Sequence, residues 1–217
     1  FKTCHFESNT NKQSGGAYVC SSDIAYTFYG CFFSANTAHE QCGALYVNTN
    51  QPFLLSGKCV IVSNVAKNGG GIYIASVSQP IVFSDISFGY NTLLDDESSN
   101  SAIYISGTNT LNFTKVTVSD NNGTKGTITI NDITKAYIED SHFNFSVSNK
   151  EPQMKLTGNY VFDTNCFIHT VASSNFEDEP VYLQHTGSGT VALDYTNCVN
   201  SSESTIDVTN KDGKFDV

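Results

Sequence analysis

The chain is organised by short segments in which apolar and polar residues alternate. An apolar–x–apolar triplet recurs along it, and its eight copies are centred on Tyr18, Tyr46, Tyr73, Tyr104, Thr129, Lys155, Tyr182 and Asp207. Successive centres lie 25 to 31 positions apart, so the repeating unit is about 27 residues long. A period of two residues indicates β-strands, and a unit of this length repeated along a chain indicates a solenoid.

Two further alternating segments occur in each unit. One runs from a Cys or a small residue to an apolar residue, as in Cys4-His5-Phe6 and Cys31-Phe32-Phe33, and the other precedes it, as in Phe53/Leu55. Gly, Asn, Ser and Asp separate the segments and favour turns. We therefore expect an all-β fold: a right-handed, single-stranded parallel β-helix of about eight coils, with three short strands per coil. Residues 1–217 form one domain in this interpretation.

Asn recurs three positions after the last apolar residue of the Cys-type segment. The positions are Asn9, Asn36, Asn64, Asn91 and Asn121. In a parallel stack these side chains lie above one another, so we expect an amide ladder in which each side chain bonds to the next coil. Asn also tolerates the left-handed backbone conformation that a tight turn can require.

Four of the triplet centres are tyrosines. Tyr18, Tyr46, Tyr73 and Tyr104 are expected to form an outward stripe that lapses at Thr129. One interpretation is cross-strand ring stacking on a solvated sheet face. The other is a strip that binds a sugar or a protein, because exposed aromatic rings bind partners at a low cost in conformational entropy.

The charge and hydropathy of the chain limit the kinds of partner that it can bind. The formal net charge is −10, and all 11 basic residues are Lys. Nucleic acid is a poor partner for such a chain, because phosphate binding needs clustered positive charge. No run of about 18 apolar residues is present, so we expect no membrane span. The abundance of Ser, Thr, Asn and Gly suits an extracellular or cell-surface β-protein.

The seven cysteines follow the repeat rather than a metal-binding motif. Equivalent inward positions are occupied by Cys4, Cys31, Cys59, Cys166 and Cys198. No CxxC pair occurs, which speaks against zinc and thioredoxin-like chemistry. Buried free thiols are the favoured interpretation. A disulfide between adjacent coils is the alternative, because stacked Cα atoms fall within the permitted separation.

Two other kinds of site are weakly indicated. Asp95, Asp96 and Glu97 lie in an inserted turn, which we interpret as a solvated acidic loop or, alternatively, a weak Ca²⁺ site. Asn-x-Ser/Thr sequons make four residues candidates for glycosylation: Asn112, Asn122, Asn144 and Asn200. No cofactor is indicated.

The first units carry two recurring motifs, which resemble those of a known family. Phe6-Glu7-Ser8-Asn9, Phe33-Ser34-Ala35-Asn36 and Phe88-Gly89-Tyr90-Asn91 resemble the FxxN motif of polymorphic outer membrane protein (Pmp) repeats. Three other segments resemble the partner motif of that family, GGA[ILV]: Gly15-Gly16-Ala17, Cys42-Gly43-Ala44 and Gly69-Gly70-Gly71-Ile72. The family includes chlamydial surface adhesins and trichomonad surface proteins. The resemblance covers residues 1–105, while residues 106–217 keep the period in degenerate coils. It implies a right-handed β-helical, surface-displayed and adhesive region.

Three functions are compatible with these patterns. The favoured one is an extracellular structural or adhesive repeat protein whose partner is a protein or glycan on another surface. A second is a filament or cell-coat subunit that associates with itself through its coil ends, which carry no evident cap; alternatively, the chain is a segment of a longer rod.

The third function is a polysaccharide lyase or glycoside hydrolase. The absence of Arg disfavours a pectate-lyase-like mechanism, and hydrolysis needs two carboxylates on one face. Asp95 and Asp96 are adjacent and would point apart in a strand, whereas Asp163 and Asp194 are interpreted as turn residues. None of the histidines lies in a recognisable catalytic motif. We therefore expect no enzymatic activity and name no catalytic residue.

Overall fold

A computed structural model describes most of the chain. It describes residues 1–94, 101–107, 110–122, 126–145 and 154–163, and five later strands: β18 (Cys166–His169), β19 (Leu183–His185), β20 (Thr190–Leu193), β21 (Val208–Asn210) and β22 (Lys214–Asp216). The described residues contain no helix, and their strands pair in parallel as a β-solenoid. About five turns of about 27 residues are described in most detail, which confirms the expected fold class.

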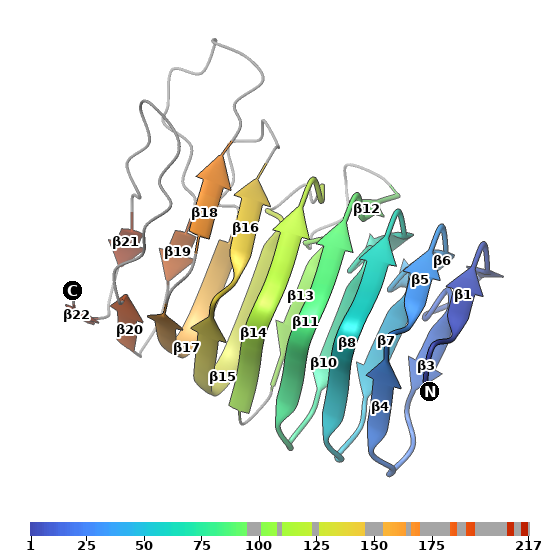
Figure 1. Cartoon of the computed structure of the whole chain (residues 1–217), viewed down its shortest axis with the longest axis horizontal. Coiled ribbons are helices and arrows are strands. Elements are labelled where there is room, and N and C mark those ends of the chain that lie inside the picture. Colours follow the sequence, from blue (N-terminus) through green and yellow to red (C-terminus); the bar gives the residue numbers. More distant parts are fainter. Residues whose placement is uncertain are drawn as a thin grey trace, which may run out of the picture.

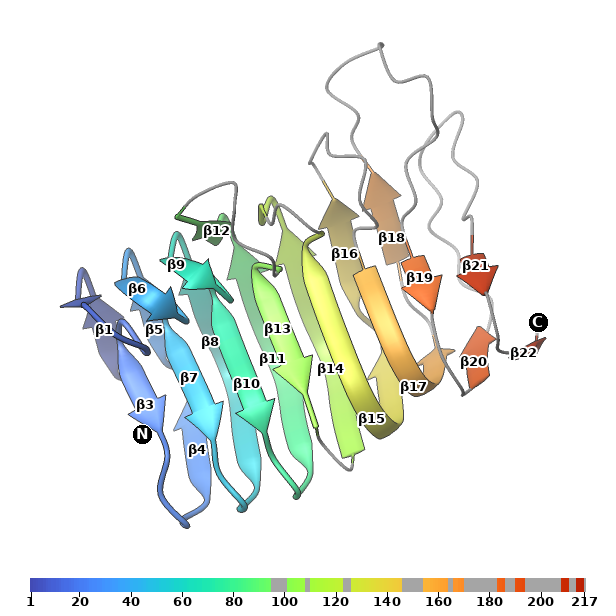
Figure 2. The same cartoon turned by 180° about the vertical axis from the view of Figure 1, so that it is seen from behind.

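One wall of the solenoid is formed by the triplets, and we call it the triplet sheet. Its strands lie side by side along the rod in Figures 1 and 2. They are β3 (Tyr18–Cys20), β7 (Leu45–Asn48), β10 (Ile72–Ser76), β13 (Ile103–Ser106), the first part of β15 (Ile128–Glu139), the first part of β17 (Met154–Asp163), and then β19 and β21. Successive strands are in register, as in the pairing of Tyr46 with Tyr73 and of Tyr73 with Tyr104.

The opposite wall, which we call the bent sheet, combines the other two predicted segments. Its strands are β1 (His5–Glu7), β4 (Tyr26–Tyr29), β5 (Phe32–Ser34), β8 (Phe53–Val62), β11 (Ile81–Gly89), β14 (Thr110–Ser119), β16 (His142–Phe145), the later parts of β15 and β17, and β18, β20 and β22. In β8, β11 and β14 the two segments are one continuous strand. At the corner the backbone adopts positive φ, as at Asp85 with 56°, and the strand turns without ending the ladder.

A short third sheet was not predicted. It contains β2 (Thr10–Asn11), β6 (Thr37–Gln41), β9 (Val65–Asn68) and β12 (Thr92–Leu93), each of which follows a ladder asparagine. These strands lie at one edge of the solenoid in Figure 2. Their sequences are largely polar, so apolar alternation gave no sign of them.

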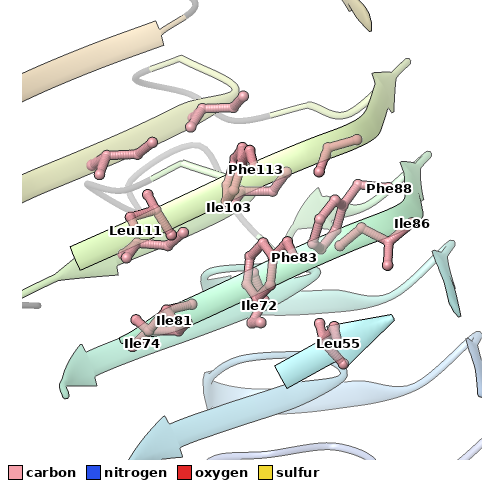
Figure 3. Close-up of a cluster of buried hydrophobic side chains, with 14 of the residues drawn as sticks. Leu55, Ile72, Ile74, Ile81, Phe83, Ile86, Phe88, Ile103, Leu111 and Phe113 are labelled. Carbon is pink, nitrogen blue, oxygen red and sulfur yellow. The ribbon is translucent and has the colours of Figure 1, made fainter. Parts of the chain in front are cut away.

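The space between the two walls is filled by apolar side chains. Ile72 and Ile74 of the triplet sheet lie beside Phe83 and Ile81 of the bent sheet in Figure 3, and all four are fully buried. Equivalent rings also stack from coil to coil, with 5.0 Å between the ring centroids of Phe83 and Phe113. The core is therefore a column that each coil extends by one layer.

The predicted amide ladder is present. The Nδ2 of Asn64 donates to the Oδ1 of Asn91 at 2.9 Å, and the backbone N of Asn64 donates to the same oxygen at 3.0 Å. The second Nδ2 proton points the other way and reaches the carbonyl oxygen of Phe33 at 3.1 Å. The same pattern joins Asn9, Asn36, Asn91 and Asn121. Each buried amide thus has partners for its donors and its acceptor, as burial requires.

The left-handed conformation at this turn belongs to the residue before the asparagine. The asparagines themselves do not have positive φ, whereas the residue before each of them does: Ser8, Ala35, Ser63, Tyr90 and Asp120, with φ between 51° and 56°. The ladder asparagine therefore occupies the position after the left-handed residue. From there its amide closes the turn, and its side chain is directed along the rod.

The glycine of the second motif fits against the neighbouring backbone. A Cβ on Gly43 would lie 2.3 Å from the carbonyl oxygen of Gly70 and 2.9 Å from the Cβ of Asn64. A Cβ on the next position of the motif meets the ladder as well, because one on Gly71 would lie 3.0 Å from the Cγ of Asn91. The Gly turn and the Asn ladder are therefore in contact at one corner of the coil.

We predict that Asn64→Ala destabilises the solenoid strongly. The substitution leaves the amide of Asn36 without its acceptor and the buried Phe33 carbonyl without its side-chain donor, and each buried unsatisfied group costs roughly 1–3 kcal/mol. Chemical denaturation should show a loss of about 3 kcal/mol. Asn50→Ala, at an exposed loop position, is the control and should change stability little. Equal effects of the two substitutions would contradict a structural role for the ladder.

We also predict that Gly43→Ala is far more harmful than Gly89→Ala. The first adds a methyl group against backbone atoms that cannot move independently, whereas a Cβ on Gly89 would find its nearest neighbour at an ordinary 3.7 Å. Thermal melts of the two variants should separate clearly, with Gly89→Ala close to the wild type. A Gly43→Ala protein that melts with the wild type would show that the corner is looser than described.

Candidate functional site

The outward side of the triplet sheet carries a stack of three tyrosine rings. The ring centroids of Tyr46 and Tyr73 are 5.8 Å apart with planes inclined by 11°, and those of Tyr73 and Tyr104 are 4.6 Å apart with planes inclined by 15°. Register fixes this arrangement, because the three residues pair directly across β7, β10 and β13. We call Tyr46, Tyr73 and Tyr104 the tyrosine ladder.

Tyr18 does not belong to the tyrosine ladder, so its assignment to the stripe was wrong. It pairs with Leu45, and Val19 is the residue that pairs with Tyr46. The ring of Tyr18 packs instead among the first-coil aromatics, 4.9 Å from Phe1 and 5.9 Å from Phe28 between ring centroids. Val19, 39% exposed, takes the outward position in the first coil.

Stacking determines which atoms of the tyrosine ladder a partner can reach. Both faces of the Tyr73 ring are covered, one by Tyr46 and the other by Tyr104. All three residues are half-exposed, and Tyr46 and Tyr104 each stack on the tyrosine ladder through one face only. The interpretation of the stripe as cross-strand stacking is confirmed for these three residues. The tyrosine ladder therefore carries one phenolic hydroxyl group per coil.

Packing also keeps the central hydroxyl neutral. Burial raises the pKa of Tyr73 above its ordinary value of 10.0, and the neighbouring phenols of Tyr104 and Tyr46 raise it further. A phenolate in the middle of the row would be poorly hydrated. The Tyr73 hydroxyl therefore stays protonated at neutral pH and can both donate and accept a hydrogen bond.

The five described cysteines are free thiols, as favoured by the sequence. Cys20, Cys31, Cys42 and Cys59 are buried, whereas Cys4 is partly exposed. The Sγ of Cys59 accepts from the backbone N of Cys31 at 3.2 Å and donates to the carbonyl oxygen of Ser56 at 3.1 Å. Burial raises the pKa of Cys20 to about 12 and that of Cys59 above its ordinary value. These thiols therefore help to close the coil corner and are not nucleophiles at neutral pH.

The remaining sequence candidates are scattered. Asp95, Asp96 and Glu97 lie outside the described residues, as does Asn200. Asn112 is half-buried within β14 and Asn144 half-buried within β16, whereas Asn122 is exposed just after the last ladder asparagine. Among the described sequons, Asn122 therefore offers the most accessible amide.

Searches for metal sites and for related proteins give no further assignment. Within the described ranges, no group of three or more His, Cys, Asp or Glu side chains is placed to hold a metal ion. The same ranges contain no helix with the length and hydropathy of a membrane span. Comparison of the chain with family models, curated proteins and solved structures finds no significant match.

We predict that the native thiols differ sharply in reactivity. Iodoacetamide should modify Cys4 first, because it is the one partly exposed thiol among the five described, and should leave Cys20, Cys31, Cys42 and Cys59 unmodified until the protein unfolds. Peptide mass spectrometry of a time course checks this order, with a urea-unfolded sample as the control. Rapid modification of Cys59 in the native protein would contradict its burial.

Proposed function

We propose that this chain is an extracellular or cell-surface repeat protein that uses the outward side of its triplet sheet as an adhesive surface. The observation that carries the proposal is the tyrosine ladder. Three large, half-exposed aromatic side chains are held in one orientation by their own stacking and by the register of the strands beneath them. Such a surface is already ordered before binding, so a partner need not supply the entropy of ordering it.

The solenoid supports this role by its rigidity. Beneath the tyrosine ladder, Ile72, Ile74, Ile103 and Ile105 are fully buried and packed against the bent sheet. Each coil is tied to the next by strand hydrogen bonds and by the amide ladder. A surface built in this way can present equivalent groups at a repeat of about 4.8 Å, the spacing of neighbouring strands.

The ring geometry favours a protein partner over a stacked sugar. A sugar bound by stacking needs an open aromatic face; both faces of the central Tyr73 ring are covered, which leaves only the outer faces of the two end rings for such stacking. A polypeptide that crosses the row can instead bond to successive hydroxyls and pack against the ring edges. Tyr is enriched in protein interfaces because it combines these two contacts.

We predict that the hydroxyl of Tyr73 is needed for adhesion but not for folding. Tyr73→Phe keeps the ring and its stacking while it removes the accessible hydroxyl, so stability should be unchanged and binding should fall on the order of tenfold if this is a central contact. Flow cytometry with cells, and arrays of matrix proteins and glycans, provide the measurement. Tyr137→Phe, at a half-buried position on the bent sheet, is the matched control and should bind like the wild type.

Three outcomes would count against the proposal. One is a wild-type protein that binds none of the cells, matrix proteins or glycans. Another is an equal loss of binding in Tyr73→Phe and Tyr137→Phe, which would separate adhesion from the tyrosine ladder. The third is a preference for glycans that survives in Tyr73→Phe, which would contradict the choice of a protein partner.

A further inference from the structure

One corner of the bent sheet carries charges of alternating sign. Lys58, Asp85, Lys115 and Asp140 occupy equivalent positions in four successive coils, each just before the inward residue of the Cys-type position. All four have positive φ, between 47° and 66°, so the backbone holds them at the same convex turn. We call these four residues the charged corner.

The four charged side chains of this corner are available for contacts outside the rod. Lys58, Lys115 and Asp140 are exposed and Asp85 is half-exposed. No ion pair within the described part of the chain engages any of them. Beside the two middle charges the neighbouring outward residues are small and polar: Ser84, Ser87, Thr114 and Thr117. Another surface can therefore approach the charged corner closely.

The alternation of charge sign avoids repulsion between neighbouring coils of one rod. Equivalent residues of adjacent coils lie one strand spacing apart, and like charges at that separation repel each other. This requirement explains why the signs differ between neighbours. The alternation within one rod still leaves the outward side of each charged group free to contact a second molecule.

An alternating row of four charges is complementary to itself when it is reversed. We propose that two copies of this chain pair side by side and antiparallel through their charged corners. A two-fold axis between Asp85 and Lys115 places Lys58 opposite Asp140 of the second copy, and Asp85 opposite Lys115 of that copy. All four contacts then join opposite charges, and each residue is used once, as an isologous interface requires.

The net charge of −10 makes this register selective. Two such chains repel each other over long distances, and only an arrangement that brings opposite charges into contact overcomes the repulsion. At about 0.15 M salt the Debye length is roughly 8 Å, which screens the long-range term more than the contacts. Exposed ion pairs are individually weak, so pairing should be strongest where copies are crowded on one surface.

Zero-length cross-linking with a carbodiimide tests the geometry directly, because it joins an amine to a carboxylate that touches it. Lys58 and Asp140 of one rod are three coils apart, roughly 14 Å at the spacing of stacked strands, so a bond between them reports contact between copies. In a mixture of ¹⁴N- and ¹⁵N-labelled protein, we expect cross-linked peptide pairs in which one peptide carries ¹⁴N and the other ¹⁵N. These pairs should form at 0.15 M salt and not at 1 M. Their absence, or cross-links only between Lys58 and Asp85, would overturn the antiparallel pair.

Charge exchange provides the matched variants. Lys58→Glu/Lys115→Glu makes the charged corner wholly acidic, and Asp85→Lys/Asp140→Lys makes it wholly basic. Analytical ultracentrifugation at high concentration should show each double variant as a monomer, their equimolar mixture as a dimer and the fourfold exchange as a self-associating protein. Failure of the mixture to associate would overturn the proposal, provided that circular dichroism shows both variants folded.

Glu7, at an exposed site outside the charged corner, provides a control for the effect of net charge. Glu7→Lys changes the net charge as much as any single exchange but lies on β1, away from the charged corner. It should leave the dimer intact, and a loss of dimer in Glu7→Lys would show that net charge, not register, governs association. Pairing is independent of the adhesive role, because Tyr73→Phe does not alter the charged corner and the charge variants leave the tyrosine ladder unchanged.

Discussion

Parallel, in-register stacking places each side chain directly above its equivalent, one strand spacing away. Every column of the solenoid must therefore consist of groups that tolerate copies of themselves. Amides meet this condition because they donate in one direction and accept in the other, as Asn36, Asn64 and Asn91 do. Aromatic rings meet it by stacking, and buried neutral thiols meet it by bonding to backbone groups. Like charges do not meet it, and the signs alternate from Lys58 to Asp85 to Lys115 accordingly.

The two motifs that recur along the first coils are joined physically at one corner. The Asn amide closes the turn after the bent sheet, and the Gly of the following turn rests on the backbone of the next coil with no room for a side chain. Because Gly71 also approaches the amide of Asn91, a larger residue in either motif would disturb the other. This contact explains why the motifs occur as a pair with a nearly fixed spacing, whatever the outer surface of the coil displays.

The period, the parallel stack, the amide ladder and the burial of the thiols could all be predicted, because each depends on residues that repeat at fixed intervals. The position of Tyr18 could not be obtained from alternation alone, since Ala17-Tyr18-Val19 satisfies the apolar triplet as well as Tyr18-Val19-Cys20 does. The paired motifs contained the missing information: aligning Gly16-Ala17 with Gly43-Ala44 puts Tyr18 opposite Leu45. The corner conformations were still harder to predict from the sequence. Lys58, Asp85 and Lys115 have positive φ because of the shape of the coil and not because of their own chemistry.

The tyrosine ladder and the charged corner belong to opposite walls, with the buried core between them. A pair formed through the charged corners would therefore leave both tyrosine ladders uncovered. Two copies joined in this way would present two equivalent adhesive surfaces that face away from each other, so one pair could bridge two separate partners. Each tyrosine ladder repeats its side chain from coil to coil, so a partner could contact more than one equivalent group of the same ladder. The stacking that makes the rod stable would thus also create the repetition on which such attachment depends.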